Sequence, residues 1–179
     1  MFEISKTEIA GLMRLDPVVR SDTRGRFVKT FHADFFTAHG LRTDFAESYY
    51  SLSRKGVLRG MHFQTPPAQH AKLVHCAAGR ILDVVVDLRR SEPSYGQFVS
   101  FELNADKGTL LYIPEGCAHG FLALSEDAMT VYNVTSVYTP AEDSGILWSS
   151  FGFEWPVREP LLSDRDLGFL PLSRFDSPF

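Results

Sequence analysis

Residues 72–103 read KLVHCAAGRILDVVVDLRRSEPSYGQFVSFEL, and this stretch decides the fold class. It contains three short runs rich in apolar and β-branched residues, Lys72–Cys76, Arg80–Leu88 and Gln97–Leu103. Each run has the length of a β-strand, and the pieces between them, AAGR and SEPSYG, carry residues typical of turns. Turns this short leave no room for the helices that a parallel sheet needs between its strands. The stretch therefore predicts antiparallel strands.

The same pattern extends along most of the chain on both sides. Further strands are expected at Phe27–Phe31, Val57–Gln64, Thr109–Ile113, His119–Leu124 and Ala128–Tyr138. Helices are expected only at Ala33–His39, which Gly40 is placed to end, and near Ser163–Leu167. Strands recurring at intervals of roughly 8–12 residues indicate an all-β sandwich or barrel. The tail, Thr139–Phe179, is expected to wrap the barrel as loops.

The composition is that of one globular domain over residues 1–179. Hydrophobic residues make up 44% of the chain and charged residues 22%, which supports a packed core and argues against disorder. The net charge of −4 lacks the basic excess typical of nucleic-acid binding. No run approaches the roughly 18–20 apolar residues of a membrane span, and no signal-peptide pattern is visible. We therefore expect no nucleic-acid or membrane partner and a cytoplasmic location. Cys76 and Cys117 match no zinc-binding spacing and are expected to be buried thiols.

The segment VLRGMHFQ carries the first candidate functional residues, Arg59 and His62. Three positions apart, they would lie on opposite faces of a regular strand. Gly60 between them permits a bulge that could bring both side chains toward one cavity. A lone histidine on an apolar strand can equally be a packed core residue. The functional interpretation gains weight because other polar groups, Lys72, His119 and Tyr132, occupy comparable strand positions.

Four segments together resemble one known family. They are VLRGMHFQ (57–64), AKLVHCAAGRILDVVVDLRRSEPSYGQF (71–98), LLYIPEGCAHGFLALSEDA (110–128), and ILWSSFGFEWP (146–156) followed by LLSDRD (161–166). In order and spacing they resemble the dTDP-4-dehydrorhamnose 3,5-epimerase family, from the DTRGRF segment at Asp22 to Asp166. The resemblance implies an all-β, cupin-type jelly-roll barrel with short peripheral helices, assembled as a homodimer. The implied substrate is a nucleoside-diphosphate 4-keto-6-deoxyhexose.

Epimerisation beside a keto group needs a base on one face of the sugar ring and a proton donor on the other. It also needs a positive group at the carbonyl oxygen to stabilise the enolate. The resemblance gives the role of base to His62, paired with Asp166, and the role of proton donor to Tyr132. Lys72 corresponds to the family lysine near the sugar carbonyl. No cofactor is expected, since the reaction needs no redox group and the chain has no dinucleotide or phosphate-loop motif.

The resemblance also implies a set of substrate-binding residues. Those that follow the family pattern are Arg24, Arg59, His119, Tyr138, Asp143 and Arg165. At four further positions the chain departs from it: Arg26 and Lys29 replace a Phe and a Glu, and Glu47 and Tyr49 replace a Gln and an Asn. Because these positions read the base and the sugar, we expect a weaker preference for thymidine. Thymidine, cytidine and guanosine stay open, as does inversion at C3, C5 or both. The alternative is that Arg26 and Lys29 simply face solvent.

A metal site is not expected. A metal-binding cupin has His-x-His in its first motif with a Glu soon after, whereas Gln64 stands here at the second histidine position and no Glu follows. His62 and His119 alone make a poor site. Two other functions remain as alternatives. A cupin sugar-nucleotide 3,4-ketoisomerase is disfavoured by Asp166 in its LSxxD context, and a non-catalytic sugar-nucleotide-binding protein would not require a base and an acid on opposite faces.

Overall fold

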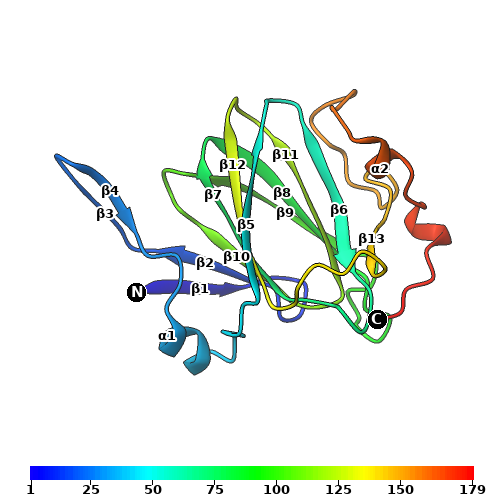
Figure 1. Ribbon diagram of the computed structural model, residues 1–179, viewed down its shortest axis with the longest axis horizontal. Helices are drawn as coiled ribbons and strands as arrows, with labels where there is room; N and C mark the ends of the chain where they lie inside the picture. The colour runs from blue at the N-terminus through cyan, green and yellow to red at the C-terminus, as the bar shows by residue number, and fades with distance from the viewer.

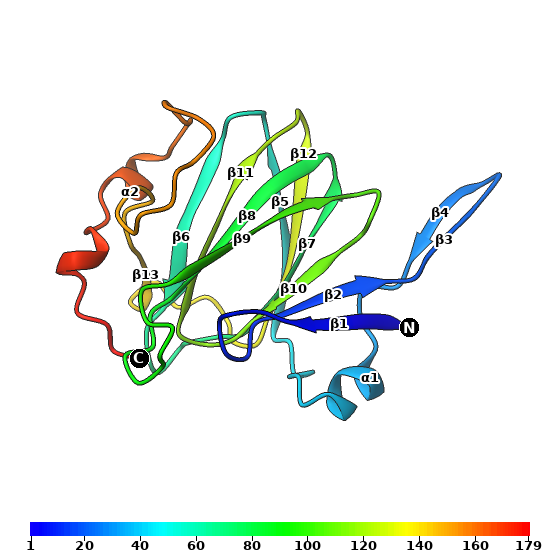
Figure 2. The same cartoon turned by 180° about the vertical axis from the view of Figure 1, so that it is seen from behind.

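Two antiparallel sheets face each other in the computed structural model, which describes residues 1–179 (Figures 1 and 2). The six-stranded sheet has the order β1 (Phe2–Lys6), β2 (Met13–Pro17), β10 (Leu110–Ile113), β7 (Lys72–Ala78), β12 (Ala128–Val134), β5 (Glu47–Ser53). The five-stranded sheet has the order β13 (Asp143–Gly145), β6 (Leu58–Gln64), β11 (Cys117–Ala123), β8 (Arg80–Asp87), β9 (Phe98–Asn104). A separate hairpin is formed by β3 (Val19–Asp22) and β4 (Gly25–Val28), and the helices are α1 (Ala33–Ala38), α2 (Asp164–Leu167) and the 3-10 turn η1 (Leu172–Arg174). The predicted all-β jelly-roll barrel with short peripheral helices is confirmed.

The main core lies between the two sheets and is built from alternate residues of their strands. Burial alternates residue by residue along β12, as expected for a strand with one face on the core. Tyr132 and Val134 of that strand share a buried cluster with Val85 of β8 and Phe121 of β11. The free thiols of Cys76 and Cys117 lie in the same cluster, which confirms that they are buried and unpaired.

The outer face of the five-stranded sheet is covered by the C-terminal tail (Figure 1). Phe151 and Trp155 of the tail join a buried cluster with Met61 of β6 and Val84 of β8. Every residue of β11 is therefore buried, including those that point away from the main core. The tail wraps the barrel as expected. On the other sheet, Phe36 of α1 packs in a third apolar cluster near the N-terminus.

Some elements differ from those expected. The strand predicted at Phe27–Phe31 is wrong in its second half, because the chain leaves the β3–β4 hairpin after Val28 and runs to α1, which His32 caps. Strands β1, β2, β3, β5 and β13 were not expected, since charged and polar residues interrupt the apolar pattern in each. The strand predicted at Ala128–Tyr138 ends at Val134. The backbone turns after this residue, and the carbonyl oxygen of Val137 accepts a hydrogen bond from the Gln64 side chain. No helix is both long and apolar enough to cross a membrane.

A bulge in β6 positions the functional residues of that strand. His62 pairs with His119 of β11, and Arg59 pairs with Phe121. The two residues between them on β6, Gly60 and Met61, therefore lie opposite a single residue of β11, Gly120. The backbones are close enough here that a Cβ on Gly60 would lie 2.7 Å from the Cα of Gly120, and Gly60 has a φ of +154°. This is the bulge that the Gly60 position predicts, and it turns Arg59 and His62 into the same cavity.

Gly120 tests this close contact. A Cβ at Gly120 would lie 2.6 Å from the Sδ of Met61 and 2.8 Å from the carbonyl oxygen of Arg59. We expect Gly120→Ala to lower the free energy of unfolding by about 1–3 kcal/mol, the usual cost of overpacking. The measurement is the urea midpoint at unchanged m-value. Gly168→Ala, where the nearest atoms are 3.5 Å away, is the matched control. Equal midpoints for the two variants would contradict the contact.

Candidate active site

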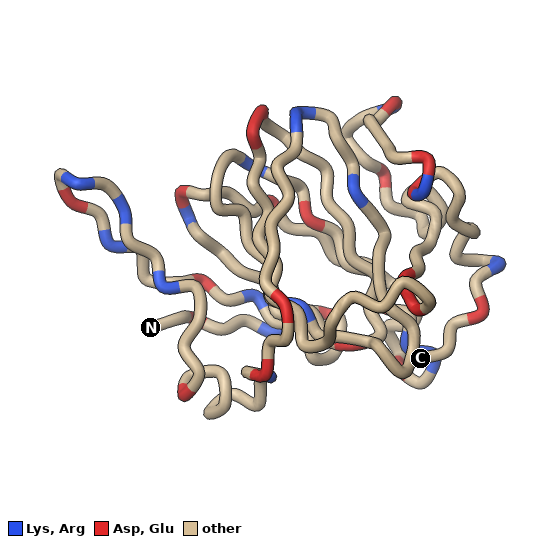
Figure 3. Tube along the Cα trace, in the orientation of Figure 1, with Lys and Arg blue, Asp and Glu red and all other residues tan.

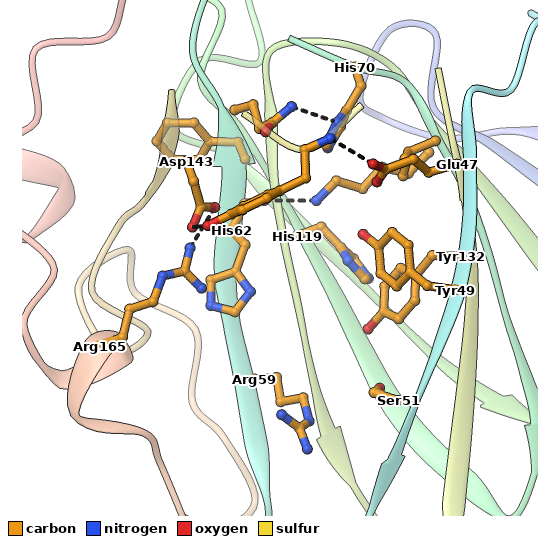
Figure 4. A pocket seen from close by; sticks show the side chains of 15 residues that line it. Glu47, Tyr49, Ser51, Arg59, His62, His70, His119, Tyr132, Asp143 and Arg165 are labelled. Carbon is orange, nitrogen blue, oxygen red and sulfur yellow. Dashed lines mark hydrogen bonds and ion pairs between the residues drawn. The ribbon is translucent and has the colours of Figure 1, made fainter. Parts of the chain in front are cut away.

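A cavity of about 490 Å³ opens between the two sheets (Figure 4). The residues that line it are Glu47, Tyr49, Ser51, Arg59, His62, Phe63, Gln64, His70, Lys72, His119, Tyr132, Val134, Tyr138, Asp143 and Arg165. His62 on β6 and Tyr132 on β12 project from opposite walls. Arg59 and Ser51 lie toward one end, and His70 and Asp143 toward the other. The cavity therefore presents an imidazole and a phenol to the two sides of a bound molecule.

His62 is held by a buried carboxylate. Its Nε2 lies 2.8 Å from Oδ1 of Asp166, and the Asp166 side chain is only 3% exposed. The second oxygen, Oδ2, accepts a hydrogen bond from the Gly60 amide, and Ser163 caps the short helix α2 that carries Asp166. The α2 turn thus docks its carboxylate against the bulge of β6. Asp166 fixes the histidine ring with Nε2 toward the carboxylate and Nδ1 on the other edge.

The electrostatics keep His62 neutral and Asp166 ionised at neutral pH. Burial lowers the pKa of His62 below its ordinary value, and the Asp166 carboxylate offsets part of that effect. The pKa of Asp166 is itself lowered, because hydrogen bonds from His62 and the Gly60 amide outweigh the burial of the carboxyl group. A neutral imidazole that donates from Nε2 leaves a free lone pair on Nδ1. The pair can therefore accept a proton from a bound molecule.

Tyr132 and Lys72 are the other two predicted catalytic residues in the cavity. Burial raises the pKa of the Tyr132 phenol, so its hydroxyl keeps its proton at neutral pH. Lys72 is 5% exposed and donates from Nζ to the backbone carbonyl of His62 at 3.0 Å. Burial lowers the pKa of Lys72 to about 8, with Asp83 and Asp143 opposing the shift. The ammonium is therefore mostly charged at neutral pH, and it lies in the same cavity as the His62 imidazole.

The remaining predicted residues of the cavity form a polar lining. Nε2 of His119 lies 2.8 Å from Oδ2 of the fully buried Asp83. Arg165 binds Asp143 at 2.7 Å, and the Tyr138 hydroxyl donates to the same carboxylate. Further contacts join Glu47 to the Tyr138 amide and Arg59 to Ser53. Eleven predicted residues are thus brought together: His62, Lys72, Tyr132, Glu47, Tyr49, Arg59, His119, Tyr138, Asp143 and Arg165 line the cavity, and Asp166 lies behind His62.

Three predicted substrate-binding residues lie outside this cavity. Arg24, at the turn of the β3–β4 hairpin, pairs with Asp22, and Arg26 pairs with Asp106 at 2.7 Å. Lys29 follows the hairpin and is exposed. The hairpin extends away from the barrel and carries a row of basic residues (Figure 3). Within one copy of the chain, these three residues are remote from His62.

Two residues that close the cavity were not predicted as site residues. The Gln64 amide nitrogen donates to the carbonyl oxygens of Ala68 and Val137, and its oxygen accepts from the Thr139 amide. Gln64 therefore holds together two loops, 65–71 and 135–142. The residue at the position where a metal-binding cupin has its second histidine thus has a structural role in this chain. His70 belongs to the first loop, and burial lowers its pKa to about 3. No sequence signal distinguishes His70 from an ordinary loop histidine.

No three His, Cys, Asp or Glu side chains are grouped so that they could hold a metal ion.

Comparison with known proteins gives one consistent result. The sequence pattern of a family described as dTDP-4-dehydrorhamnose 3,5-epimerase matches residues 6–174. A protein of that name from Shigella flexneri is 44% identical over 167 residues, which cover 92% of each chain. The crystal structure of the Bacillus anthracis enzyme of that name, with TDP and PPi bound, superposes with a TM-score of 0.93 at 33% identity, covering 96% of this chain and 100% of that one. A 3′-monoepimerase from Streptomyces bikiniensis, in complex with dTDP-quinovose, has a TM-score of 0.88 at 36% identity over 93% of this chain and 86% of that one.

The His62–Asp166 pair allows a direct test of the site's electrostatics. Asp166→Asn removes the carboxylate that raises the pKa of His62 but keeps the burial that lowers it. We therefore expect the His62 pKa to fall further below 6.5 in this variant than in the wild type. The measurement is an NMR titration of the imidazole Cε1 proton, assigned by its loss in His62→Asn. Asp164→Asn, on the exposed side of the same helix, is the control. An unchanged or higher pKa in Asp166→Asn would contradict the assigned pairing.

Proposed function

Because this chain belongs to the dTDP-4-dehydrorhamnose 3,5-epimerase family, we propose that its cavity is the active site in which His62 and Tyr132 invert a carbon beside a keto group. The protein is an isomerase that epimerises a nucleoside-diphosphate 4-keto-6-deoxyhexose. The observation that carries the assignment of residues is the placement of a neutral imidazole and a protonated phenol on opposite walls of one cavity. The site itself requires no cofactor for this chemistry.

In the first step, Nδ1 of His62 takes the proton from a carbon next to the C4 keto group. The electron pair of the broken C–H bond forms a C=C bond, and the negative charge passes to the C4 oxygen. The ammonium of Lys72 stabilises this enolate, and such preorganised charge typically contributes about 10²–10³-fold to the rate. The imidazolium that forms on His62 is stabilised by Asp166, 2.8 Å away.

In the second step, the Tyr132 hydroxyl donates its proton to the same carbon from the opposite face. The C=C electrons form the new C–H bond, the C4 carbonyl is restored, and the carbon has the inverted configuration. Tyr132 is left as a phenolate and His62 as an imidazolium, so one proton returns through solvent to reset the pair. The raised pKa of Tyr132 makes the phenolate a strong base, which favours its rapid reprotonation.

Deuterium exchange separates the two steps. In D₂O the wild type should both wash deuterium into the sugar beside the keto group and invert that carbon, as read by proton NMR. We expect His62→Asn to lower wash-in by about 10²–10⁴-fold, the usual contribution of a general base. Tyr132→Phe should retain wash-in but lose most of the inverted product, since the base remains and the opposite proton donor is gone. The carbons that exchange identify C3, C5 or both as reacting centres.

Each variant has an outcome that contradicts its assignment. Wash-in at the wild-type rate in His62→Asn would remove His62 as the base, and normal inversion in Tyr132→Phe would remove Tyr132 from the mechanism. A product with the keto group moved to C3 would indicate a ketoisomerase. Tight nucleotide-sugar binding with neither wash-in nor inversion in the wild type would indicate a binding protein.

We further propose that the protein works as a homodimer in which the β3–β4 hairpin of one copy reaches the cavity of the other. The hairpin extends beyond its own barrel (Figures 1 and 2), and Phe27 on it is 61% exposed. An aromatic side chain and several cations on one exposed hairpin suit a base and a diphosphate. They line a hollow of the hairpin itself, and none of them lines the cavity that contains His62 in the same chain. In the dimer, the cavity of the second copy receives the hairpin. Arg59 and Arg165 are the cations within the cavity that would bind the diphosphate from the other side.

The free, buried thiols of Cys76 and Cys117 support a reducing compartment, and on that ground we propose a cytoplasmic location.

Nucleotide affinity tests the hairpin and the base preference together. We expect Arg26→Ala to weaken nucleoside-diphosphate binding by tenfold or more, although Arg26 lies outside its own cavity. TDP, CDP, UDP and GDP titrated calorimetrically against the wild type should differ by less than tenfold, or about 1.4 kcal/mol. We expect these small differences because the Arg26 guanidinium can stack on any base and can donate hydrogen bonds to acceptors of cytosine or guanine.

Two controls complete the experiment. Lys107→Ala removes an exposed cation close to Asp106, the partner of Arg26, and should leave the affinities unchanged. Sedimentation should give the mass of two chains for the wild type and for Arg26→Ala. A monomeric wild type with full nucleotide affinity would exclude the dimeric site. If TDP bound at least tenfold more tightly than every other nucleotide, the expected loss of thymidine preference would be wrong.

A further inference from the structure

The ring of Tyr132 is held by a second tyrosine of the cavity wall. Tyr49 on β5 and Tyr132 on β12 are directly opposite each other in the antiparallel pairing of the two strands. Their ring centroids are 4.9 Å apart with an angle of 20° between the planes, which is a stacked pair. Figure 4 shows the two rings side by side on the wall opposite His62. The stack covers one face of the Tyr132 ring.

A histidine contacts the same ring in another direction. The His119 imidazole meets the Tyr132 ring at 5.9 Å with an angle of 71°, an edge-on contact, and Asp83 fixes that imidazole. A phenol reaches its position through two torsions, one about Cα–Cβ and one about Cβ–Cγ. A stacked ring on one side and an edge-on ring on another restrict both torsions. These two contacts therefore restrict the directions in which the Tyr132 hydroxyl can point.

Of these neighbours, Tyr49 is the one at the open side of the cavity. It is 45% exposed, whereas His119 is 3% exposed. Strand alternation places Tyr49 on the cavity side of β5, between Glu47 and Ser51, and its neighbour Tyr50 on the opposite face.

We propose that Tyr49 is a positioning residue, which holds the Tyr132 ring at the angle that aims its hydroxyl at the face of the sugar opposite His62. This inference rests on the roles proposed above for His62 and Tyr132. Without the stack, His62 still removes the proton, because no contact joins it to Tyr49. The Tyr132 ring, however, gains room to turn toward the open side of the cavity. Reprotonation from the opposite face then slows, and more of the enolate returns to the starting configuration by way of His62.

Tyr49→Leu tests this through the ratio of inversion to deuterium wash-in. We expect kcat for inversion to fall tenfold or more, while wash-in at the same carbon stays within about threefold of the wild type. Tyr49→Phe keeps the ring and should restore the wild-type ratio. Tyr95→Leu, a matched change in the loop between β8 and β9, controls for general effects of removing a partly exposed tyrosine. Circular dichroism of all three variants checks that they fold.

The outcomes separate this inference from the function on which it rests. An unchanged ratio in Tyr49→Leu would overturn the positioning role, and so would a rise in KM with kcat unchanged, which would make Tyr49 a substrate contact only. A fall in wash-in equal to the fall in inversion would also overturn it. Failure of the proposed function appears elsewhere, as wild-type wash-in in His62→Asn or normal inversion in Tyr132→Phe.

Discussion

The backbones of β6 and β11 touch at Gly60 and Gly120, and the arrangement of the active site depends on this contact. The extra residue of the bulge lets Arg59 and His62, three positions apart, face the same cavity. The bulge also leaves the Gly60 amide free to donate to Asp166, whose other oxygen holds His62. One backbone irregularity therefore sets the positions of Arg59, of His62 and of the Asp166 carboxylate that holds the His62 ring. A side chain at either glycine would disturb all three.

Burial between the sheets sets the protonation states that the reaction needs. It lowers the pKa of His62 and raises that of Tyr132, so at neutral pH the imidazole is uncharged and the phenol retains its proton. Burial also lowers the pKa of Lys72, but the charges of Asp83 and Asp143 oppose this and keep the pKa at about 8. The low-polarity interior would be costly for isolated charges, and each buried charge accordingly has an opposite charge or several hydrogen bonds nearby.

Two departures from the family pattern lie in different parts of the molecule. Tyr49 lies inside the cavity, where its ring can act on the geometry of Tyr132. Arg26 lies on the β3–β4 hairpin, which points away from its own barrel. Its guanidinium group makes a surface ion pair with Asp106. On the roles proposed for them, Tyr49 would affect how a proton is delivered and Arg26 would affect which nucleotide is bound. Stereochemistry and base preference would then be set at separate places in the fold.

The resemblance of short motifs to a known family predicted His62, Tyr132, Lys72 and Asp166 as site residues, and the structure places three of them in one cavity with Asp166 behind His62. The alternating apolar runs likewise determined the strands of the barrel interior. Tertiary structure alone decided the rest. Strand β5 has little apolar signal because its inward face is a polar cavity wall. The stack of Tyr49 on Tyr132 depends on a pairing between strands that are far apart in the sequence. The loops held by Gln64 and the location of Arg26 outside its own cavity follow from contacts between distant segments, which no local sequence pattern encodes.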